Sequence, residues 1–288
     1  MSLSDDLQAA NRKAGGSHLT IQARNGQLRG FARYCREHGY QIQRADQIKE
    51  KHIRGYMESL AGKNSERTRQ NKLAALRVAI RTTGKTKYAD GIDTRKMGVQ
   101  AASRDGTKRA ITETEYKAVL ARAEALDKGA AAAVQLCRAL GLRRTEAVCA
   151  DAKTLKRWAE RIEKGQRVEV VRGTKGGRYR ETMYSDQNRA REAVSNALRI
   201  ARENGGHLIK TPGGGLKESV KRFENVAARA GLKGETSLHS LRYAFASERL
   251  DQLQREGYDR REAAVLVSID LGHGDGRGAY IEQVYSKR

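Results

Sequence analysis

The sequence predicts a mainly α-helical fold with one small β-sheet, an α+β architecture, and three observations support this. Apolar residues recur at helical spacing through residues 18–83 and again beyond Thr112. Between these stretches, residues 84–108 are basic, contain glycine and lack an apolar period, as is typical of a linker. Alternating apolar residues flank a Gly-Gly pair within residues 167–184 and predict a hairpin.

The expected organisation follows from these three features. The chain has 288 residues, which is enough for two ordinary domains that each bury a core. We expect a helical domain over 1–84, a basic interdomain linker over 85–110 and a second domain over 111–288.

The composition is strongly basic. The chain has 57 Lys and Arg against 34 Asp and Glu, a formal net charge of +23 and an isoelectric point near 10.2. Because the excess is spread over both halves of the chain, no single charged tail explains it. Such a surface predicts a polyanion as partner, duplex DNA or RNA; a protein with merely solvated lysines and arginines is the alternative.

Other features of the composition bear on location and cofactors. The three cysteines form no Cys-x-x-Cys pair, so neither a disulfide framework nor a zinc site is expected. The sequence has no apolar run of bilayer length and no signal-peptide pattern. We therefore expect a cytoplasmic protein without a membrane partner.

The first domain is expected to be a small helical unit with a basic surface. Leu28 and Phe31 share one helix face, and Ser65 or Asn64 caps a later helix. The apolar face of that later helix is formed by Leu73, Leu76 and Ile80. The basic residues expected to lie off the core and to contact DNA are Arg67, Arg69, Lys72 and Arg77, with Lys85 and Lys87 from the linker.

The second domain begins at a capping box, Thr112 to Glu115. A helix over 130–140 then leads into a Gly-Leu-Arg-Arg-Thr-Glu segment that holds Arg143 and Glu146. These two residues lie one helical turn apart, so the carboxylate can hold the guanidinium by a charge-assisted hydrogen bond. Alone, such a pair is more often a surface ion pair of little consequence.

A helix over 154–163 and a strand over 167–171 are expected next. The hairpin that follows carries Lys175 at its tip and, just beyond the Gly-Gly pair, Arg178, which is a further expected DNA contact. An ordinary exposed turn lysine is the alternative interpretation of Lys175. Two further helices are expected over 187–203 and 217–230.

The C-terminal stretch brings together groups suited to an anion. His239 and Arg242 are three residues apart, on one face of a helix, and can reach a common point. His273 follows a Leu-Gly pair, and Tyr285 lies near the end of the chain. Imidazoles, a guanidinium and a phenol suit phosphoryl transfer, which depends on positioning and charge stabilisation, with the phenol as nucleophile.

Taken together, these motifs resemble the tyrosine recombinase, or phage integrase, family. The resemblance rests on the segment around Arg143, the hairpin Lys175, the His-x-x-Arg of residues 239–242, the Leu-Gly-His ending at His273, and the late tyrosine. It implies a site-specific DNA recombinase of a mobile genetic element. It also implies that the first domain is a core-binding domain that clamps the duplex and that the second is catalytic.

The resemblance implies a covalent mechanism in which a tyrosine attacks a DNA phosphate, giving a 3′-phosphotyrosyl link and a free 5′ hydroxyl. Tyr285 is the expected nucleophile because its Gln-Val-Tyr-Ser context is similar to the family's Gln-Ile-Tyr-Thr. Tyr280 is the alternative, and the two lie seven and twelve residues beyond His273, neither at the usual family spacing. The resemblance also implies roles for the other residues. Arg143 and Arg242 would neutralise the transition state, supported by Glu146, and Lys175 would be the general acid at the 5′ oxygen. His239 would act as acid and base at the tyrosine, and His273 would donate a hydrogen bond to a non-bridging oxygen.

The resemblance further implies that neither metal nor ATP is needed, that four protomers assemble on two DNA sites, and that accessory DNA-bending proteins can take part. A type IB topoisomerase or a telomere-resolving enzyme would use the same groups. A non-cleaving DNA-binding relative is the remaining alternative.

Overall fold

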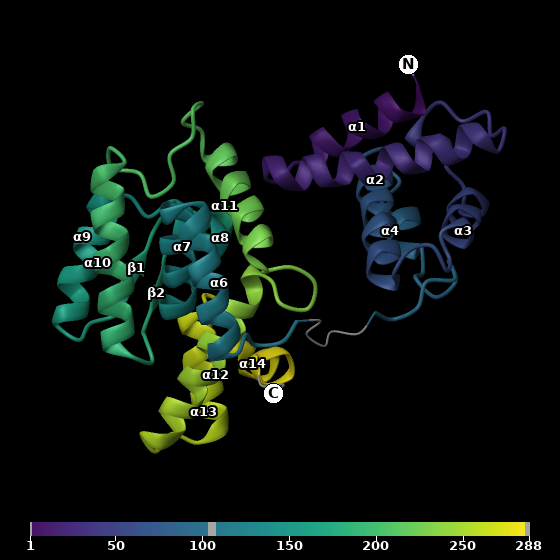
Figure 1. The fold of residues 1–288 in the computed structure, drawn as a ribbon. Helices are drawn as coiled ribbons and strands as arrows, with labels where there is room; N and C mark the ends of the chain where they lie inside the picture. Colours follow the sequence, from purple (N-terminus) through teal and green to yellow (C-terminus); the bar gives the residue numbers. More distant parts are fainter. Residues whose placement is uncertain (1, 103–107, 286–288) are drawn as a thin grey trace. The chain divides into compact units, whose positions relative to one another are not determined.

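The computed structural model describes residues 2–102 and 108–285. The chain divides into two compact units, Met1–Ser103 and Arg104–Arg288, which are described in turn (Figure 1). Within the described ranges, no helix has both the length and the apolar character needed to cross a membrane.

The regular elements described in the first unit are helices. They are α1 (Leu3–Ala14), α2 (His18–Glu37), the 3-10 turn η1 (Ala45–Gln47), α3 (Glu50–Ser59), α4 (Glu66–Arg81) and α5 (Thr86–Gly91). Ser2, Ser17 and Ser65 cap α1, α2 and α4, each with its hydroxyl accepting a backbone N–H of the first turn. Helices α1, α2 and α4 pack against one another, and their apolar faces form the core of the unit.

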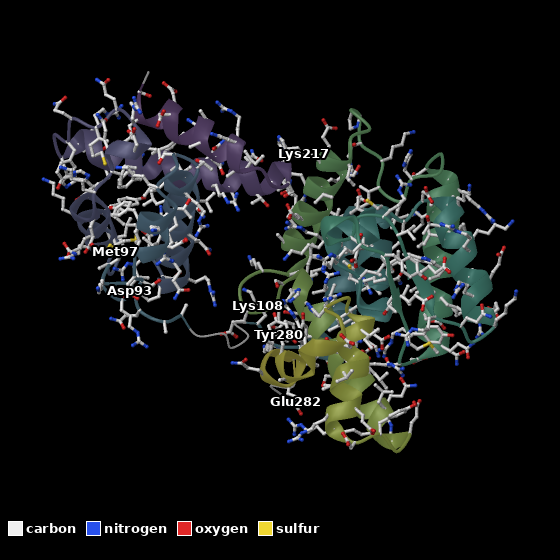
Figure 2. All side chains as sticks on the ribbon, turned by 180° about the vertical axis from the view of Figure 1, so that it is seen from behind. Asp93, Met97, Lys108, Lys217, Tyr280 and Glu282 are labelled. Carbon is white, nitrogen blue, oxygen red and sulfur yellow. The ribbon has the colours of Figure 1, made fainter. Side chains whose placement is uncertain are left out.

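The segment expected as a linker is partly built into this first unit, which corrects the expected limits of 1–84 and 85–110. Helix α5 lies within that segment and packs against α4. Three apolar side chains beyond α5 are buried in the same core: Ile92, Met97 and Val99 (Met97 is labelled in Figure 2). They occur singly among basic and turn residues, so the sequence shows no period there. Residues 103–107 of the expected linker lie outside the described residues.

In the second unit, helices surround a central alanine-rich helix, α7 (Lys128–Leu140), in which Ala130 to Ala133 are all buried. Small side chains let neighbouring helices approach closely, and α7 contacts five of them. These are α6 (Glu113–Leu126), α8 (Arg144–Val148), α10 (Gln187–Glu203), α11 (Leu216–Ala230) and α12 (Leu238–Arg255). The helices expected over 187–203 and 217–230 correspond to α10 and α11.

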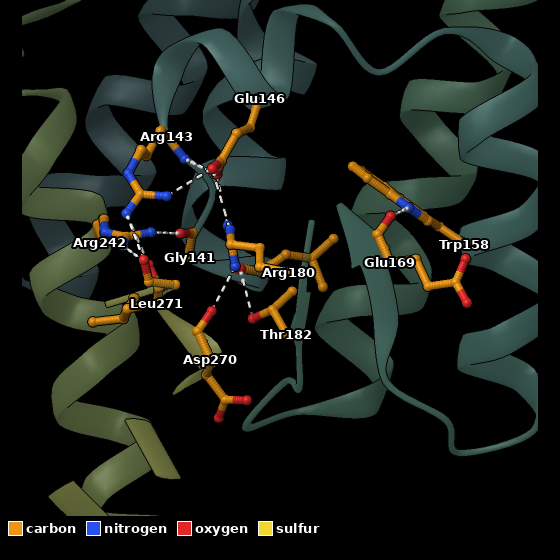
Figure 3. Close-up of polar contacts among 12 residues, drawn as sticks. Gly141, Arg143, Glu146, Trp158, Glu169, Arg180, Thr182, Arg242, Asp270 and Leu271 are labelled. Atoms are coloured by element: carbon orange, nitrogen blue, oxygen red, sulfur yellow. Dashed lines mark hydrogen bonds and ion pairs between the residues drawn. The ribbon is translucent and has the colours of Figure 1, made fainter. Parts of the chain in front are cut away.

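The second unit also contains the expected hairpin. Strands β1 (Val168–Val170) and β2 (Arg180–Thr182) pair antiparallel, with Val168 opposite Thr182. Helix α9 (Ala152–Glu163) lies beside them, and the Trp158 indole N–H donates to the Glu169 carbonyl at 2.7 Å (Figure 3). The predicted fold class, mainly α with a small sheet, is confirmed.

The end of the described chain packs around α12. Helices α13 (Arg260–Asp270) and α14 (Gly278–Tyr285), joined through the 3-10 turn η3 (Asp275–Arg277), share an apolar cluster with α12. Tyr243, Phe245 and Tyr285 belong to this cluster. This packing places Tyr285 of α14 against α12, the helix that contains His239 and Arg242.

Candidate active site

The first element of the site is the turn between α7 and α8. Gly141 ends α7 in the left-handed region, with φ of 58°, and a Cβ there would lie 2.5 Å from the Phe245 ring. The turn places Arg143 just ahead of α8, where its backbone N–H and Nη1 donate to the two oxygens of Glu146 at 2.7 and 2.8 Å. The contact expected between Arg143 and Glu146 is therefore present.

Arg242 is the most deeply buried guanidinium of the site, with 1% of the residue exposed. Its Nη1 and Nη2 donate to the carbonyls of Gly141 and Leu271 (Figure 3). Among the described residues it has no carboxylate in ion-pair contact. Burial lowers the pKa of Arg242 to about 10, so the group is still protonated at neutral pH.

The carboxylate of Glu146 is shared with a second arginine, Arg180, at the start of β2. Arg180 donates through Nε and Nη2 to the two Glu146 oxygens at 3.1 and 2.6 Å, in a bidentate pair that is buried from solvent. Burial alone would raise the pKa of Glu146, but Arg180, the Arg143 backbone N–H and Arg242 outweigh it and lower that pKa to about 2. Glu146 is therefore an anion held between two guanidiniums.

The turn after α13 presents His273 to these arginines. Arg143 Nη2 donates to the Leu271 carbonyl at 3.0 Å, and Arg180 Nη1 donates to the Asp270 carbonyl. These carbonyls end α13, where the helix dipole favours cations. Gly272 has φ of 66°, and a Cβ there would approach Arg180 Cδ to 2.5 Å, so the glycine of the Leu-Gly-His motif is required sterically.

Tyr285 lies at the centre of the site. Its phenolic oxygen is 3.3 Å from His239 Nε2 and 3.5 Å from His273 Nε2. Its ring stacks at a tilt against Tyr243, with centroids 4.5 Å apart, and only 1% of the residue is exposed. The two histidines and the tyrosine singled out in the sequence therefore meet in the structure.

Tyr280, the alternative nucleophile, occupies a different place on α14 (Figure 2). Its ring packs edge-on against His273, with centroids 5.3 Å apart. No hydrogen bond joins its hydroxyl to the histidines among the described contacts, in contrast to Tyr285. The geometry therefore favours Tyr285 over Tyr280.

Both histidines have lowered pKa values. Burial, followed by the charges of Arg242 and Arg143, lowers the pKa of His273 to about 3. Loss of water around the ring, followed by the same two arginines, lowers the pKa of His239, although the residue as a whole is exposed. Both imidazoles are therefore neutral at pH 7 and can accept a proton or, through one nitrogen, donate a hydrogen bond.

A cleft of about 920 Å³ opens beside this cluster. Its lining includes Arg143, His273, Tyr280 and, from the hairpin loop, Lys175 and Arg178. Lys175 is exposed and has no hydrogen bond or ion pair to the described residues, so its ammonium can turn into the cleft. A DNA backbone bound in this cleft would lie close to Lys175, Arg143 and Arg178.

The basic residues predicted to contact DNA differ in their exposure to solvent. Lys85, Lys87 and Arg178 are exposed, as is Arg67. Arg77 is half-buried, with donors to the Ile92 carbonyl and Thr94, and Lys72 lies against the Tyr56 ring and hydroxyl. These two are partly engaged in packing.

Arg69 requires a correction as a DNA contact. It is 4% exposed, and its donors reach Glu66 at 2.5 Å and the carbonyls of Met57 and Gly98 at 3.1 and 2.8 Å. Its position four residues before Leu73 sets it on the apolar face of α4, a signal that the sequence does contain. Arg69 joins three segments of the first unit and is not available to a phosphate.

Arg180 and Asp270 are the residues of the site that sequence reasoning missed. Asp270 is fully buried and pairs with Arg249 at 3.2 Å and with Arg167. Arg180 lies two residues past Arg178, in strand β2, where side chains point alternately toward the core and toward solvent. Its inward direction could therefore be predicted from the sequence, but its partners could not. Across the described residues, no group of three or more His, Cys, Asp or Glu is arranged to hold a metal ion.

The fold and the site define a class of protein: enzymes that break and rejoin DNA strands by phosphoryl transfer to a tyrosine. The sequence pattern of the family described as "Integrase" matches residues 98–248, and that described as "Phage integrase, N-terminal" matches residues 1–89. The chain belongs to the integrase family of tyrosine recombinases and is a site-specific DNA recombinase.

Solved structures agree with this fold. A lambda integrase dimer bound to a COC′ core site matches with a TM-score of 0.65 at 16% identity, covering 97% of this chain and 77% of that one. XerH recombinase bound to its difH substrate matches with a TM-score of 0.60 at 19% identity, covering 99% and 81%. A lambda integrase tetramer on a Holliday junction matches with a TM-score of 0.59 at 16% identity, covering 94% and 76%. Among curated protein sequences, none matches this chain.

Proposed function

We propose that this recombinase cleaves double-stranded DNA with Tyr285 as the nucleophile. The observation that carries the proposal is the approach of the Tyr285 oxygen to two neutral imidazoles, at 3.3 and 3.5 Å, beside the buried Arg242. A free phenol has a pKa of about 10, so attack at neutral pH needs a proton acceptor and nearby positive charge. The site supplies both.

The cleavage step balances as follows. The Tyr285 oxygen forms a bond to phosphorus while the bond to the 5′ oxygen breaks, and the phenol proton passes to His239. Lys175 gives a proton to the leaving 5′ oxygen, which becomes a free hydroxyl. The product is a 3′-phosphotyrosyl link that conserves the energy of the phosphodiester, so rejoining by the reverse step consumes no ATP.

The remaining residues stabilise charge. Arg143 and Arg242 neutralise the non-bridging oxygens of the pentavalent transition state, and Glu146 holds Arg143 in place. His273 donates a hydrogen bond to a non-bridging oxygen. Because the guanidiniums neutralise the charge of the transition state, no step of this mechanism requires a metal ion.

DNA binding and assembly extend the proposal. The first unit clamps the duplex through its exposed cations, Arg67, Lys85 and Lys87, while Arg178 contacts the backbone beside the cleaved phosphate. Exchange between two duplexes uses four nucleophiles, so the working complex is a tetramer on two DNA sites, as in the lambda integrase tetramer on a Holliday junction. The enzyme acts in the cytoplasm on the DNA of a mobile element.

Covalent capture tests the nucleophile. Purified protein is mixed with a library of nicked duplexes containing a randomised region, and DNA that stays attached under denaturing conditions is recovered and sequenced. We expect capture by wild type and by Tyr280→Phe, and none by Tyr285→Phe. Capture lost only in Tyr280→Phe would transfer the role to that tyrosine.

The same experiment separates the other functions. Specific binding without any covalent adduct would identify a non-cleaving relative, and relaxation of supercoiled plasmids that lack the captured sequence would identify a topoisomerase. Because only purified protein is present, recombination of two captured sites also reports whether accessory DNA-bending proteins are needed.

A further inference from the structure

We propose that Arg180 is a positioning residue that sets the charge with which Arg143 faces the DNA phosphate. The proposal rests on the function proposed above and adds a residue to it. Arg180 borders the cleft, but each of its three side-chain nitrogens already donates to a group within the protein, two of them to Glu146. It acts on the phosphate through Glu146.

Charge counting gives the first argument. Arg143 donates twice to Glu146, by its backbone N–H and by Nη1. With Glu146 alone, the guanidinium and the carboxylate would form a neutral pair that offers little to an anion. Arg180 binds both oxygens of the same carboxylate and brings the three groups to a net charge of +1 (Figure 3).

Burial makes that balance matter. Glu146 is 1% exposed and Arg180 6% exposed, so water screens neither group. Removing one partner of a buried pair leaves an uncompensated charge. Without Arg180, the whole negative charge of Glu146 would fall on Arg143, whose side chain is 24% exposed at the cleft.

Position in the chain gives the second argument. Arg180 begins β2, directly after the loop that carries Lys175, and its Nη1 donates to the Asp270 carbonyl at the end of α13. Gly272 approaches its Cδ so closely that no larger residue fits. Arg180 therefore joins the Arg143 turn, the hairpin and the His273 turn, which come from three distant parts of the sequence.

The test compares two linkages at the cleaved position of the captured DNA: the natural phosphodiester and one stereoisomer of a methylphosphonate, which lacks the negative non-bridging oxygen. Cleavage rates are measured at saturating DNA, and their ratio is the readout. In Arg180→Gln we expect the phosphodiester rate to fall about 10- to 100-fold and the methylphosphonate rate to fall much less, so the ratio falls by about tenfold. Arg180→Lys, which keeps the charge, should hold the ratio near that of wild type.

Arg138→Gln is the matched control, since Arg138 is also buried and paired with a carboxylate, that of Glu248, away from the cleft. It should lower thermal stability without changing the ratio. An equal fall on both linkages in Arg180→Gln would mean a purely structural role and would overturn the proposal, as would no fall on either.

Glu146→Gln keeps the proposal testable if Arg180→Gln fails to fold. This change removes the negative charge from Arg143, so the ratio should stay at or above that of wild type even if both rates drop. A fall in the ratio would contradict the charge argument. Failure of wild type to form any adduct would instead reject the proposed function, so the two failures are distinct.

Discussion

Two buried arginines, one in each unit of the molecule, show how a structural guanidinium differs from one that we propose acts in catalysis. Arg69 in the first unit and Arg242 in the second are 4% and 1% exposed. Both donate to two backbone carbonyls, and both leave Nε without a partner. Neither burial nor an unpaired donor therefore distinguishes them.

The difference lies in the carboxylate. Arg69 is paired with Glu66 at 2.5 Å, so its charge is cancelled where it lies. Arg242 binds neutral carbonyls, and the described residues offer it no ion pair. Carbonyls orient a guanidinium without neutralising it, so Arg242 keeps a full positive charge for an incoming anion. The partner set of an arginine, more than its burial, indicates its role.

Removing the uncancelled charge should have the largest effect. We expect Arg242→Gln to lower the rate of covalent adduct formation about 10³-fold, the scale of a lost transition-state contact in a dry site. Single-turnover cleavage of the captured DNA measures it. Arg69→Gln is the paired control, and its cleavage rate at saturating DNA should stay within about threefold of wild type, because its charge is already cancelled. Comparable losses in both variants would refute the distinction.

Lys175 differs from both buried arginines, because it is an exposed cation that has no hydrogen-bond or ion-pair partner among the described residues. Lys175→Ala should lower cleavage about 10²-fold, as expected for a lost general acid. A substrate with sulfur in place of the 5′ bridging oxygen has a leaving group that needs no proton, and it should restore most of the rate. Lys87→Ala, an exposed lysine of the first unit, is the control and should show no such restoration. If the sulfur substrate leaves the Lys175→Ala defect unchanged, the lysine is not the general acid.

Arg69 should instead matter for stability. Arg69→Met leaves two carbonyls and Glu66 without their donor, and we expect the free energy of unfolding to fall by about 2 kcal/mol. Arg81→Met is the control, since its ion pair with Asp90 is exposed and worth about 0.5 kcal/mol or less. Chemical unfolding of the two variants compares them. Equal stability of the two would show that the buried contacts of Arg69 contribute nothing.

How far the sequence predicted this structure depended on the range of the interactions. Arg143 with Glu146, and His239 with Arg242, lie within one helical turn, so local spacing was enough. Arg180 reaches Glu146 from 34 residues away, and such a pairing leaves no local pattern. The hairpin and the helices could be predicted because their periods are regular, whereas the buried residues after α5 could not because they stand alone.

The exposure of the basic residues on α4 could not be predicted from the sequence composition. Arg67, Arg69 and Arg77 on α4 look alike in sequence, because each is a long cation near an apolar face. Their long apolar stems allow either burial or exposure, so composition cannot assign them. Arg69 lies on the face of α4 that packs against the core, and its hydrogen-bond partners show that its role is structural.

The neutral state of His273 beside Arg242 should make the stability of the protein depend on pH. The pKa of His273 is lowered to about 3 in the folded enzyme, by burial first and then by Arg242, against an ordinary value of 6.5. The unfolded chain therefore binds the proton more readily between these values. The contribution of this group is present above pH 6.5 and is lost as the pH falls below it.

His273→Gln removes that titration. We expect the free energy of unfolding of wild type to decline from pH 6.5 to pH 4.5 more steeply than that of the variant, a window chosen to lie above the pKa of Glu146, about 2. Chemical unfolding at intervals through this range measures both slopes. Equal slopes in wild type and His273→Gln would mean that the imidazole is not held neutral. In that case neither burial nor the charge of Arg242 would keep His273 neutral, and the contrast with Arg69 would lose this support.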